Sequence, residues 1–295
     1  MNAICVEPRS STSEVRVAEH AGRAVLTELL LTPKPGLVDR RNCGAHDDMD
    51  FQTFLASARA IAPWWHRFVE KGHASAHVPA GALLPLVRPT GVLCERAMFE
   101  ATRGVNTHKG AIFSLGLLCF AAGRLDAQGI APSRERMCEE VAGMCAGLVE
   151  RELDRAQEPR TAGERAFRSH GLGGARAEAA SGYASVQVVT LPVYDRLRRA
   201  GVGDEVALLE VLLHLMAFNP DTNLVSRGGL AGLQHVRERA RGLLREGGAL
   251  APDGLKKMEA LDDDLIARHL SPGGSADLLG VTWFLAQFPT ETEAR

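Results

Sequence analysis

The segment FQTFLASARAIAPWWHRF, residues 51–68, places large apolar side chains at steps of three and four residues. Because an α-helix makes one turn in about 3.6 residues, this spacing gathers those side chains on one face. Pro63 lies inside the run, so we expect a kink or a break there. The segment predicts an amphipathic helix against a core, with the apolar face formed by Phe51, Phe54, Leu55, Ala58, Ile61, Trp65 and Phe68.

Helical periodicity recurs along the whole chain, and no stretch alternates apolar and polar residues for long enough to predict a strand. Residues 36–50 are expected to be irregular or a small hairpin, residues 72–89 a connector, and residues 155–164 an exposed loop. None of them resembles a domain linker. The sequence therefore predicts an all-α fold, a single large multi-helical domain over residues 1–295 with functional loops between the helices. Further helices are expected over residues 13–31, 91–103, 109–123, 133–156, 175–200, 204–218, 230–246, 253–270 and 275–288.

The bulk composition indicates a soluble protein. Of the 295 residues, 45% are hydrophobic and 24% are charged, and the net charge of −2 gives no general attraction to nucleic acid or to acidic membranes. The apolar stretch 111–122 is too short to cross a bilayer and predicts a buried helix. The first residues lack the pattern of a secretory signal, and the six cysteines contain no CxxC pair. We expect a cytoplasmic protein with reduced thiols and neither nucleic acid nor membrane as a partner.

Polar chemistry is concentrated between the expected helices. In TPKPG, residues 32–36, two prolines stiffen the backbone around Lys34, and a stiff backbone lowers the entropy lost when the ammonium binds a phosphate. The segment fits equally well with a simple helix stop whose lysine is solvated. The carboxylates of residues 42–50 are suited to Mg²⁺ or to capping the next helix, and capping is the more frequent role.

The segment GVNTHKGAIF, residues 104–113, has Asn106, Thr107, His108 and Lys109 directly before an apolar helix. Free backbone N–H groups at such a helix end, together with a lysine, form a suitable anion site. Capping by Thr107 alone would not require the basic pair that follows it. The consensus of a nucleotide-binding P-loop is absent.

Three later junctions have the same character: HGLGGARAE (170–178), NPDTNLVSRGG (219–229) and SPGGSADLLG (271–280). Each could be ordinary helix punctuation, but packing alone does not require so many glycine-bearing polar junctions. No strand precedes the first of them, which excludes a Rossmann fingerprint.

Taken together, TPKPGLVD, GAH-x-DM, GVNTHKGAIFSLGLL, GxxGARAE, DTNLVSRGG and SPGGSADLL resemble the triphosphoribosyl-dephospho-CoA synthase family. The resemblance covers residues 31–288, and NTHKG and SPGGSADLL are its specific parts. Ala177 departs from it, since we expect glycine there. The resemblance implies an all-α transferase that moves the triphosphoribosyl group of ATP to the 2′-hydroxyl of 3′-dephospho-CoA and releases adenine. The product would be the prosthetic-group precursor for the acyl carrier protein of citrate lyase or malonate decarboxylase.

The resemblance also implies partners and a reaction course. The substrates are ATP and 3′-dephospho-CoA, and further partners to consider are a downstream holo-acyl-carrier-protein transferase and a second copy of the chain. Because the family's product carries an α linkage and ATP is a β-nucleoside, a single inverting displacement is the simplest path. Such a displacement has an oxocarbenium-like transition state and needs a proton acceptor for the hydroxyl and a clamp for the triphosphate.

Roles can be assigned to the motif residues on this basis. Lys34, Lys109, Arg176 and Arg227 are expected to contact phosphate, while Asn106, Thr107, Gly173, Gly174 and Asn223 complete the substrate site. Asp39, Asp48 and Asp221 are the Mg²⁺ candidates. Glu178 is the first choice for the catalytic base and Asp277 the second, and His108 is the candidate donor to the leaving adenine.

Two other functions are compatible with parts of the sequence. An all-helical metal-dependent phosphohydrolase could use His46 and Asp47 as an HD pair, but this pair precedes a helix and would need further ligands. Such an enzyme would release phosphate or pyrophosphate, whereas a synthase releases adenine. A non-enzymatic helical scaffold would show a repeat or a large apolar groove, and the sequence shows neither.

Overall fold

The computed structural model describes residues 12–154 and 162–294, and within these residues it contains helices and no strand. The predicted all-α single domain is confirmed. The α-helices are α1 (Thr12–Leu30), α2 (Phe51–His73), α3 (Leu83–Ala101), α4 (Lys109–Ala127), α5 (Arg134–Met144), α6 (Ala162–His170), α7 (Gly174–Ala180), α8 (Leu191–Arg199), α9 (Asp204–Phe218), α10 (Thr222–Arg245), α11 (Gly254–Ala267), α12 (Gly273–Ala286) and α13 (Glu291–Ala294). Short 3₁₀ turns (Ala80–Ala82, Gly248–Leu250) and π turns (Glu150–Asp154, Val186–Thr190) complete the set.

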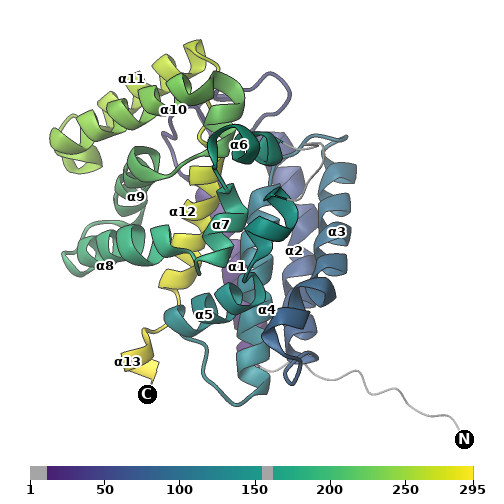
Figure 1. Cartoon of the computed structure of the whole chain (residues 1–295). Helices are drawn as coiled ribbons and strands as arrows, with labels where there is room; N and C mark the ends of the chain where they lie inside the picture. Colours follow the sequence, from purple (N-terminus) through teal and green to yellow (C-terminus); the bar gives the residue numbers. More distant parts are fainter. Residues whose placement is uncertain (1–11, 155–161, 295) are drawn as a thin grey trace, which may run out of the picture.

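Helix α4 is the centre of the fold. Figure 1 shows α1, α4 and α12 side by side through the middle, and each of the three contacts the other two. Helices α2 and α3 cover one side, and α8 to α11 lie on the other. By length and composition α4 could cross a membrane, but 78% of its most apolar window is buried in the core. It is therefore the buried helix that the sequence predicts, and it extends beyond the apolar stretch at both ends.

The amphipathic segment of residues 51–68 forms most of α2. Asp50 begins this helix with a capping box, in which its Oδ1 accepts from the backbone N–H of Thr53 at 2.8 Å. The helix continues through Pro63, so no break occurs there. Ile61 and Trp65, on either side of the proline, are buried in the core, and this packing holds the helix together across the missing hydrogen bond.

Several predicted boundaries are wrong. The connector predicted over residues 72–89 ends early, because α3 begins at Leu83 and takes in Pro85 and Pro89. Pro85 lies in the first turn, where backbone N–H groups have no partner within the helix. The helix predicted over residues 133–156 ends at Met144. The polar loop predicted over residues 155–164 lies mostly outside the described residues.

The helix predicted over residues 175–200 is interrupted between α7 and α8. Tyr183 has a positive φ of 57°, and its buried hydroxyl donates to the carbonyl of Ser114 at 3.1 Å. This tertiary bond outweighs the helical pattern of the local sequence. The turn predicted over residues 219–229 is instead the first part of α10, which begins at Thr222 and bends at Gly229 (φ 62°, ψ −166°).

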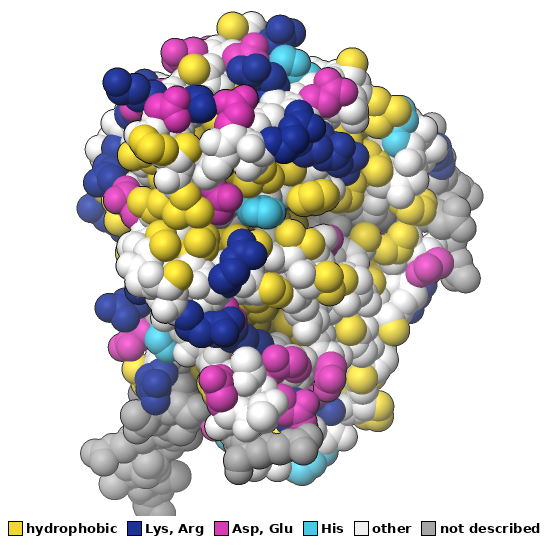
Figure 2. Space-filling view, turned by 90° about the vertical axis from the view of Figure 1, so that its left-hand side faces the viewer, with side chains coloured by type: hydrophobic (Ala, Val, Ile, Leu, Met, Phe, Trp, Pro, Cys, Tyr) yellow, Lys and Arg dark blue, Asp and Glu magenta, His cyan; other side chains and the backbone are white. Residues whose placement is uncertain are grey.

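The surface charges and the cysteine thiols are as the composition of the sequence indicates. On the face in Figure 2, Lys and Arg side chains are interspersed with Asp and Glu, so that face carries no extended basic surface. The five cysteines in the described part of the chain are unpaired, and all but Cys43 are buried. Burial raises the pKa of Cys94 to about 12, as expected of a packing thiol.

Candidate active site

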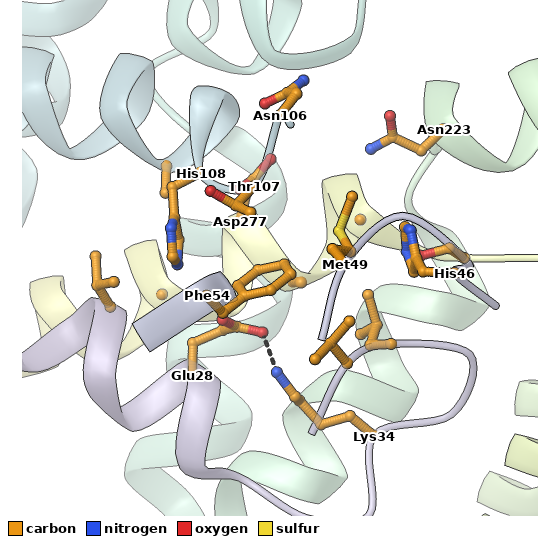
Figure 3. A pocket seen from close by; sticks show the side chains of 18 of the residues that line it. Glu28, Lys34, His46, Met49, Phe54, Asn106, Thr107, His108, Asn223 and Asp277 are labelled. Atoms are coloured by element: carbon orange, nitrogen blue, oxygen red, sulfur yellow. Dashed lines mark hydrogen bonds and ion pairs between the residues drawn. The ribbon is translucent and has the colours of Figure 1, made fainter. Parts of the chain in front are cut away.

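All the predicted polar junctions except residues 170–178 contribute to the wall of one cavity of about 290 Å³ (Figure 3). Its wall is formed by α1, by the loop after it, and by the N-terminal parts of α2, α4, α10 and α12. Segments far apart in the sequence therefore share one site. Eight of the predicted site residues line it: Lys34, Asp48, Asn106, Thr107, His108, Asn223, Arg227 and Asp277.

Lys34 is held at the cavity by a loop that is folded around two carboxylates. The backbone N–H of Lys34 donates to Asp39 at 2.9 Å, and that of Gly36 donates to Asp262 at 2.9 Å. The Lys34 side chain is 1% exposed, and its Nζ lies 2.5 Å from the Oε1 of Glu28 on α1. The stiff, proline-flanked backbone thus delivers a buried ammonium to a buried carboxylate.

Asp277 enters from the first turns of α12 and meets the start of α4. The backbone N–H of Ala111 hydrogen-bonds its carboxylate. This approach requires glycine at residue 110, since a Cβ there would lie 1.9 Å from Oδ2 of Asp277. Burial, and then the negative charges of Glu28 and Asp221, raise the pKa of Asp277 well above its usual range. Asp277 is thus a carboxyl group that favours the protonated form.

His108 lies at the N-terminal end of α4, buried beside the ring edge of Phe54. The hydroxyl of Thr107 donates to Ser57 Oγ at 2.7 Å, and Ser57 Oγ lies 2.7 Å from Nδ1 of His108. Since Ser57 accepts from Thr107, its own proton is available for Nδ1, which leaves the imidazole proton on Nε2. That Nε2 has no hydrogen-bond partner among the described residues. Burial and the charge of Lys34 lower the pKa of His108 to about 3, so the ring is a neutral donor.

Arg227 lies at the mouth of the cavity on the first part of α10. Its guanidinium donates to the carbonyl of Ala45 at 2.7 Å and to Nδ1 of His46 at 2.9 Å. Nε2 of His46 lies 2.9 Å from Ser271 Oγ, so the imidazole joins the α10 and α12 sides of the site. Burial and the nearby Arg227 lower the pKa of His46. Arg227 stays largely exposed and remains open to an anion.

Comparison with known proteins identifies the kind of protein that carries this site. Residues 14–295 match the profile of the family described as ATP:dephospho-CoA triphosphoribosyl transferase. The chain belongs to this family. It is accordingly a transferase, of the triphosphoribosyl-dephospho-CoA synthase type.

Individual relatives agree with the family match, and three of them share the name 2-(5''-triphosphoribosyl)-3'-dephosphocoenzyme-A synthase. The Klebsiella pneumoniae protein is 53% identical over 285 residues, which cover 96% of this chain and 93% of that protein. The Pectobacterium atrosepticum protein is 50% identical, covering 98% of this chain and 94% of its own. The Escherichia fergusonii protein is 49% identical, covering 96% and 95%. No solved structure matches the chain.

Three predicted site residues of this transferase lie near the cavity without lining it. Lys109 points outward, with its side chain 48% exposed and its Nζ 3.0 Å from Glu95. Asp39 accepts the backbone N–H groups of Lys34 and Arg41 and so shapes the loop. Asp221 accepts from the backbone of Asn223 and from both the backbone and the hydroxyl of Ser275, and thereby caps α10 and α12 together.

The α7 segment lies outside the cavity wall. Arg176 forms ion pairs with Glu152 at 3.0 Å and with Glu164 at 3.9 Å. Glu178 accepts a hydrogen bond from the Ser185 hydroxyl at 2.6 Å, and burial raises its pKa. Gly173 precedes this helix and Gly174 begins it, and a Cβ on Gly174 would lie 3.1 Å from the side chain of Thr222 at the start of α10. The segment therefore supports the start of α10, which carries Asn223 and Arg227.

The described residues form no group of three or more His, Cys, Asp or Glu side chains suited to a metal ion. Of the Mg²⁺ candidates, only Asp48 reaches the cavity, where it is 62% exposed and lies 3.6 Å from Nδ1 of His46. The carboxylates of Asp39 and Asp221 are already occupied by N–H and O–H donors. The protein side chains alone do not fit a preformed Mg²⁺ site, which would need several free oxygen ligands.

Sequence reasoning missed two polar residues of the site, Glu28 and Ser57. Both lie inside helices and outside every polar junction, one on α1 and one on α2. The one signal that could have identified them is a polar residue on a helix face that otherwise carries apolar core residues. Reading that signal requires knowing which face of each helix is buried.

Proposed function

We propose that this transferase moves the triphosphoribosyl group of ATP to the 2′-hydroxyl of 3′-dephospho-CoA and releases adenine. The observation that carries the proposal is the composition of the cavity. The carboxyl groups of Glu28 and Asp277 and the neutral donor His108 share one small space, with the exposed Asp48 also in its wall and an exposed arginine at its mouth. A displacement at a sugar carbon needs groups that take a proton from the attacking hydroxyl and give one to the leaving base, and a polyanionic substrate needs the cation outside them.

The size of the cavity is consistent with a reacting sugar inside it and phosphates outside it. Pockets that enclose a drug-sized ligand have volumes of about 300–1,000 Å³, so a cavity of about 290 Å³ can enclose the reacting sugar and its immediate neighbours only. The phosphates of both substrates would remain at the mouth. There Arg227, Asn223 and Asn106 are exposed and offer N–H donors.

The magnesium ion of the proposed reaction would arrive with the ATP phosphates. No step of the mechanism is assigned to it, because the described side chains do not form a site of their own for it. The names of the relatives support a role in prosthetic-group biosynthesis. Citrate lyase and malonate decarboxylase remain the two proposed recipients. Cytoplasmic location, self-association and a downstream transferase partner are proposed with them.

A metal-dependent hydrolase has weaker support. Its HD pair would need the His46 imidazole as a metal ligand, yet one ring nitrogen accepts from Arg227 and the other is bonded to Ser271. Neither nitrogen is left for a metal.

The test is to incubate the purified protein with ATP, MgCl₂ and 3′-dephospho-CoA and to follow adenine and phosphate by chromatography. Adenine should appear in the same amount as dephospho-CoA disappears. CoA is the matched control substrate, since its 3′-phosphate would bring a dianion beside two carboxylates and should make turnover poor. Phosphate without adenine would favour the hydrolase instead.

A further inference from the structure

Glu28 is a carboxylate whose burial is not explained by the packing of α1. It is 9% exposed, it lines the cavity, and its partner Lys34 is 1% exposed. Removing two charges from water is costly, and a buried ion pair seldom stabilises a fold more than apolar residues of the same size would. The contact with Lys34 does have one clear geometric effect, because it fixes the Glu28 carboxylate in an ion pair at the cavity wall.

Asp277 is the opposite kind of carboxyl group. It faces the same cavity from α12, and the groups that act on its charge are Glu28 on α1, Asp221 before α10 and the N–H of Ala111 on α4. No Lys or Arg is among the described groups that shift its pKa. Glu28 is therefore paired with a cation, whereas Asp277 is partly buried and lies near the carboxylates of Glu28 and Asp221. Figure 3 shows the two side chains entering from different helices.

An inverting displacement at a sugar carbon requires one group that accepts a proton and a second group that donates one, and two carboxyl groups on different walls of a cavity can fill these roles. We propose that Glu28 is the base that accepts the proton of the attacking hydroxyl, and that Asp277 is the acid that protonates the departing nucleobase. This inference rests on the proposed function. Lys34 is then a positioning residue that holds the Glu28 carboxylate through their ion pair, and its main contact is not with phosphate.

The proposed step balances. The hydroxyl oxygen forms a bond to C1 of the ribose while its proton passes to Glu28. The C1–N9 bond breaks, its electron pair goes to the purine, and the proton of Asp277 goes to a purine nitrogen. Glu28 ends protonated and Asp277 ionised, and exchange with solvent after product release restores both.

The first experiment compares Glu28→Gln with Glu140→Gln. Glu140 is the matched control, because it forms a part-buried ion pair with Arg124, with 2.6 Å between Oε1 and Nε. This pair does not line the cavity. Glu28→Gln should lower kcat by about 10²- to 10⁴-fold with little change in the KM of ATP, the range for loss of a general base. Glu140→Gln should keep kcat near that of the unchanged protein.

Glu28→Gln leaves the Lys34 charge unpaired, so reduced stability must be separated from reduced chemistry. The double variant Glu28→Gln/Lys34→Met removes both charges. Its melting temperature should recover toward that of the unchanged protein, while its kcat stays as low as that of Glu28→Gln. A double variant that folds and turns over normally would overturn the assignment of Glu28.

The second experiment distinguishes base from acid with 8-azaadenosine triphosphate, whose purine leaves more readily as an anion than adenine does. The kcat deficit of Asp277→Asn should shrink with this substrate, since a better leaving group needs less help from an acid. The deficit of Glu28→Gln should stay the same. The reverse pattern would refute both roles. If the unchanged protein releases no adenine at all, the proposed function itself fails, whereas an active protein with an active Glu28→Gln variant removes only this inference.

Discussion

Gly110 and Asp277 are in direct contact, and no larger residue fits at position 110. A Cβ there would lie 1.9 Å from Oδ2 of Asp277 and 2.6 Å from its Cγ. The first turn of α4 can approach the carboxyl group only because it has no side chain at that point. The glycine of the NTHKG motif is thus explained by a residue of the SPGGSADLL motif.

Gly110→Ala should therefore displace Asp277 and lower kcat more than tenfold, with a reduced melting temperature from overpacking. Gly91→Ala is the control, since nothing lies within 4 Å of the Cβ it would add on α3. That control should be neutral or more stable by up to about 1 kcal/mol. Equal activity of both variants and the unchanged protein would mean that the Gly110–Asp277 contact has no role in the reaction.

The raised pKa of Asp277 predicts a pH effect on stability with a defined sign. Between the ordinary carboxyl range and that raised pKa, the folded protein binds more protons than the unfolded chain, so stability falls as pH rises. Asn cannot ionise, so the melting temperature of Asp277→Asn should increase relative to that of the unchanged protein as pH rises through this window. Thermal melts from pH 4 to 8 measure the difference, and a constant difference would contradict the raised pKa.

The same group should control activity on the alkaline side. If Asp277 must be protonated, kcat/KM of the unchanged protein falls as pH rises through its pKa, and Asp277→Asn lacks this decline. Burial is the largest cause of that raised pKa, and the charges of Glu28 and Asp221 raise it further.

The Thr107–Ser57–His108 chain predicts one fixed tautomer. In ¹⁵N spectra, His108 should stay neutral with its proton on Nε2 from pH 5 to 8, because its pKa is about 3. Ser57→Ala removes the donor to Nδ1 and should lower kcat about 2- to 10-fold, equivalent to one neutral hydrogen bond of about 0.5–1.5 kcal/mol. A protonated His108 at pH 6, or a proton on Nδ1, would contradict this hydrogen-bond chain.

Arg227 should act on binding more than on chemistry. Arg227→Gln loses the exposed guanidinium at the cavity mouth and should raise the KM of ATP about 10- to 100-fold, equivalent to about 1.5–3 kcal/mol for a charge-assisted bond. Arg239→Gln is the control on the same helix, where the guanidinium pairs with Asp264 instead. If the two variants have equal KM values for ATP, Arg227 does not contact its phosphates.

The sequence was sufficient for the fold class and for most of the segments that line the cavity, but the predicted site included residues 170–178, omitted α1, and did not give the direction of each side chain. His108 and Lys109 are neighbours in one motif, yet the first is 3% exposed in the cavity and the second points outward to Glu95. Which of the two faces inward depends on the rotation of α4, and that rotation is set by the packing of the whole helix against α1, α2 and α12.

The carboxylates show the same limit. Glu178 follows an arginine in a glycine-rich motif, which made it the first candidate for the base, but its partner is Ser185 and it lies outside the cavity wall. Glu28 is one of three glutamates on α1, and only the packing of α1 beside α12 and the Lys34 loop shows that it reaches the cavity. Local pattern predicted where polar chemistry gathers, and tertiary packing decided which carboxylates reach it.

The proposed reaction requires that the ribose and all three phosphates move together while only the base departs. The most direct measurement uses ATP labelled with ¹³C in the ribose and ¹⁸O in the γ-phosphate, incubated with the protein, MgCl₂ and 3′-dephospho-CoA and analysed by mass spectrometry. We expect a dephospho-CoA adduct that carries both labels, together with unlabelled adenine in equal amount. An adduct without the γ-phosphate label, or labelled phosphate released with no free adenine, would contradict the proposed reaction.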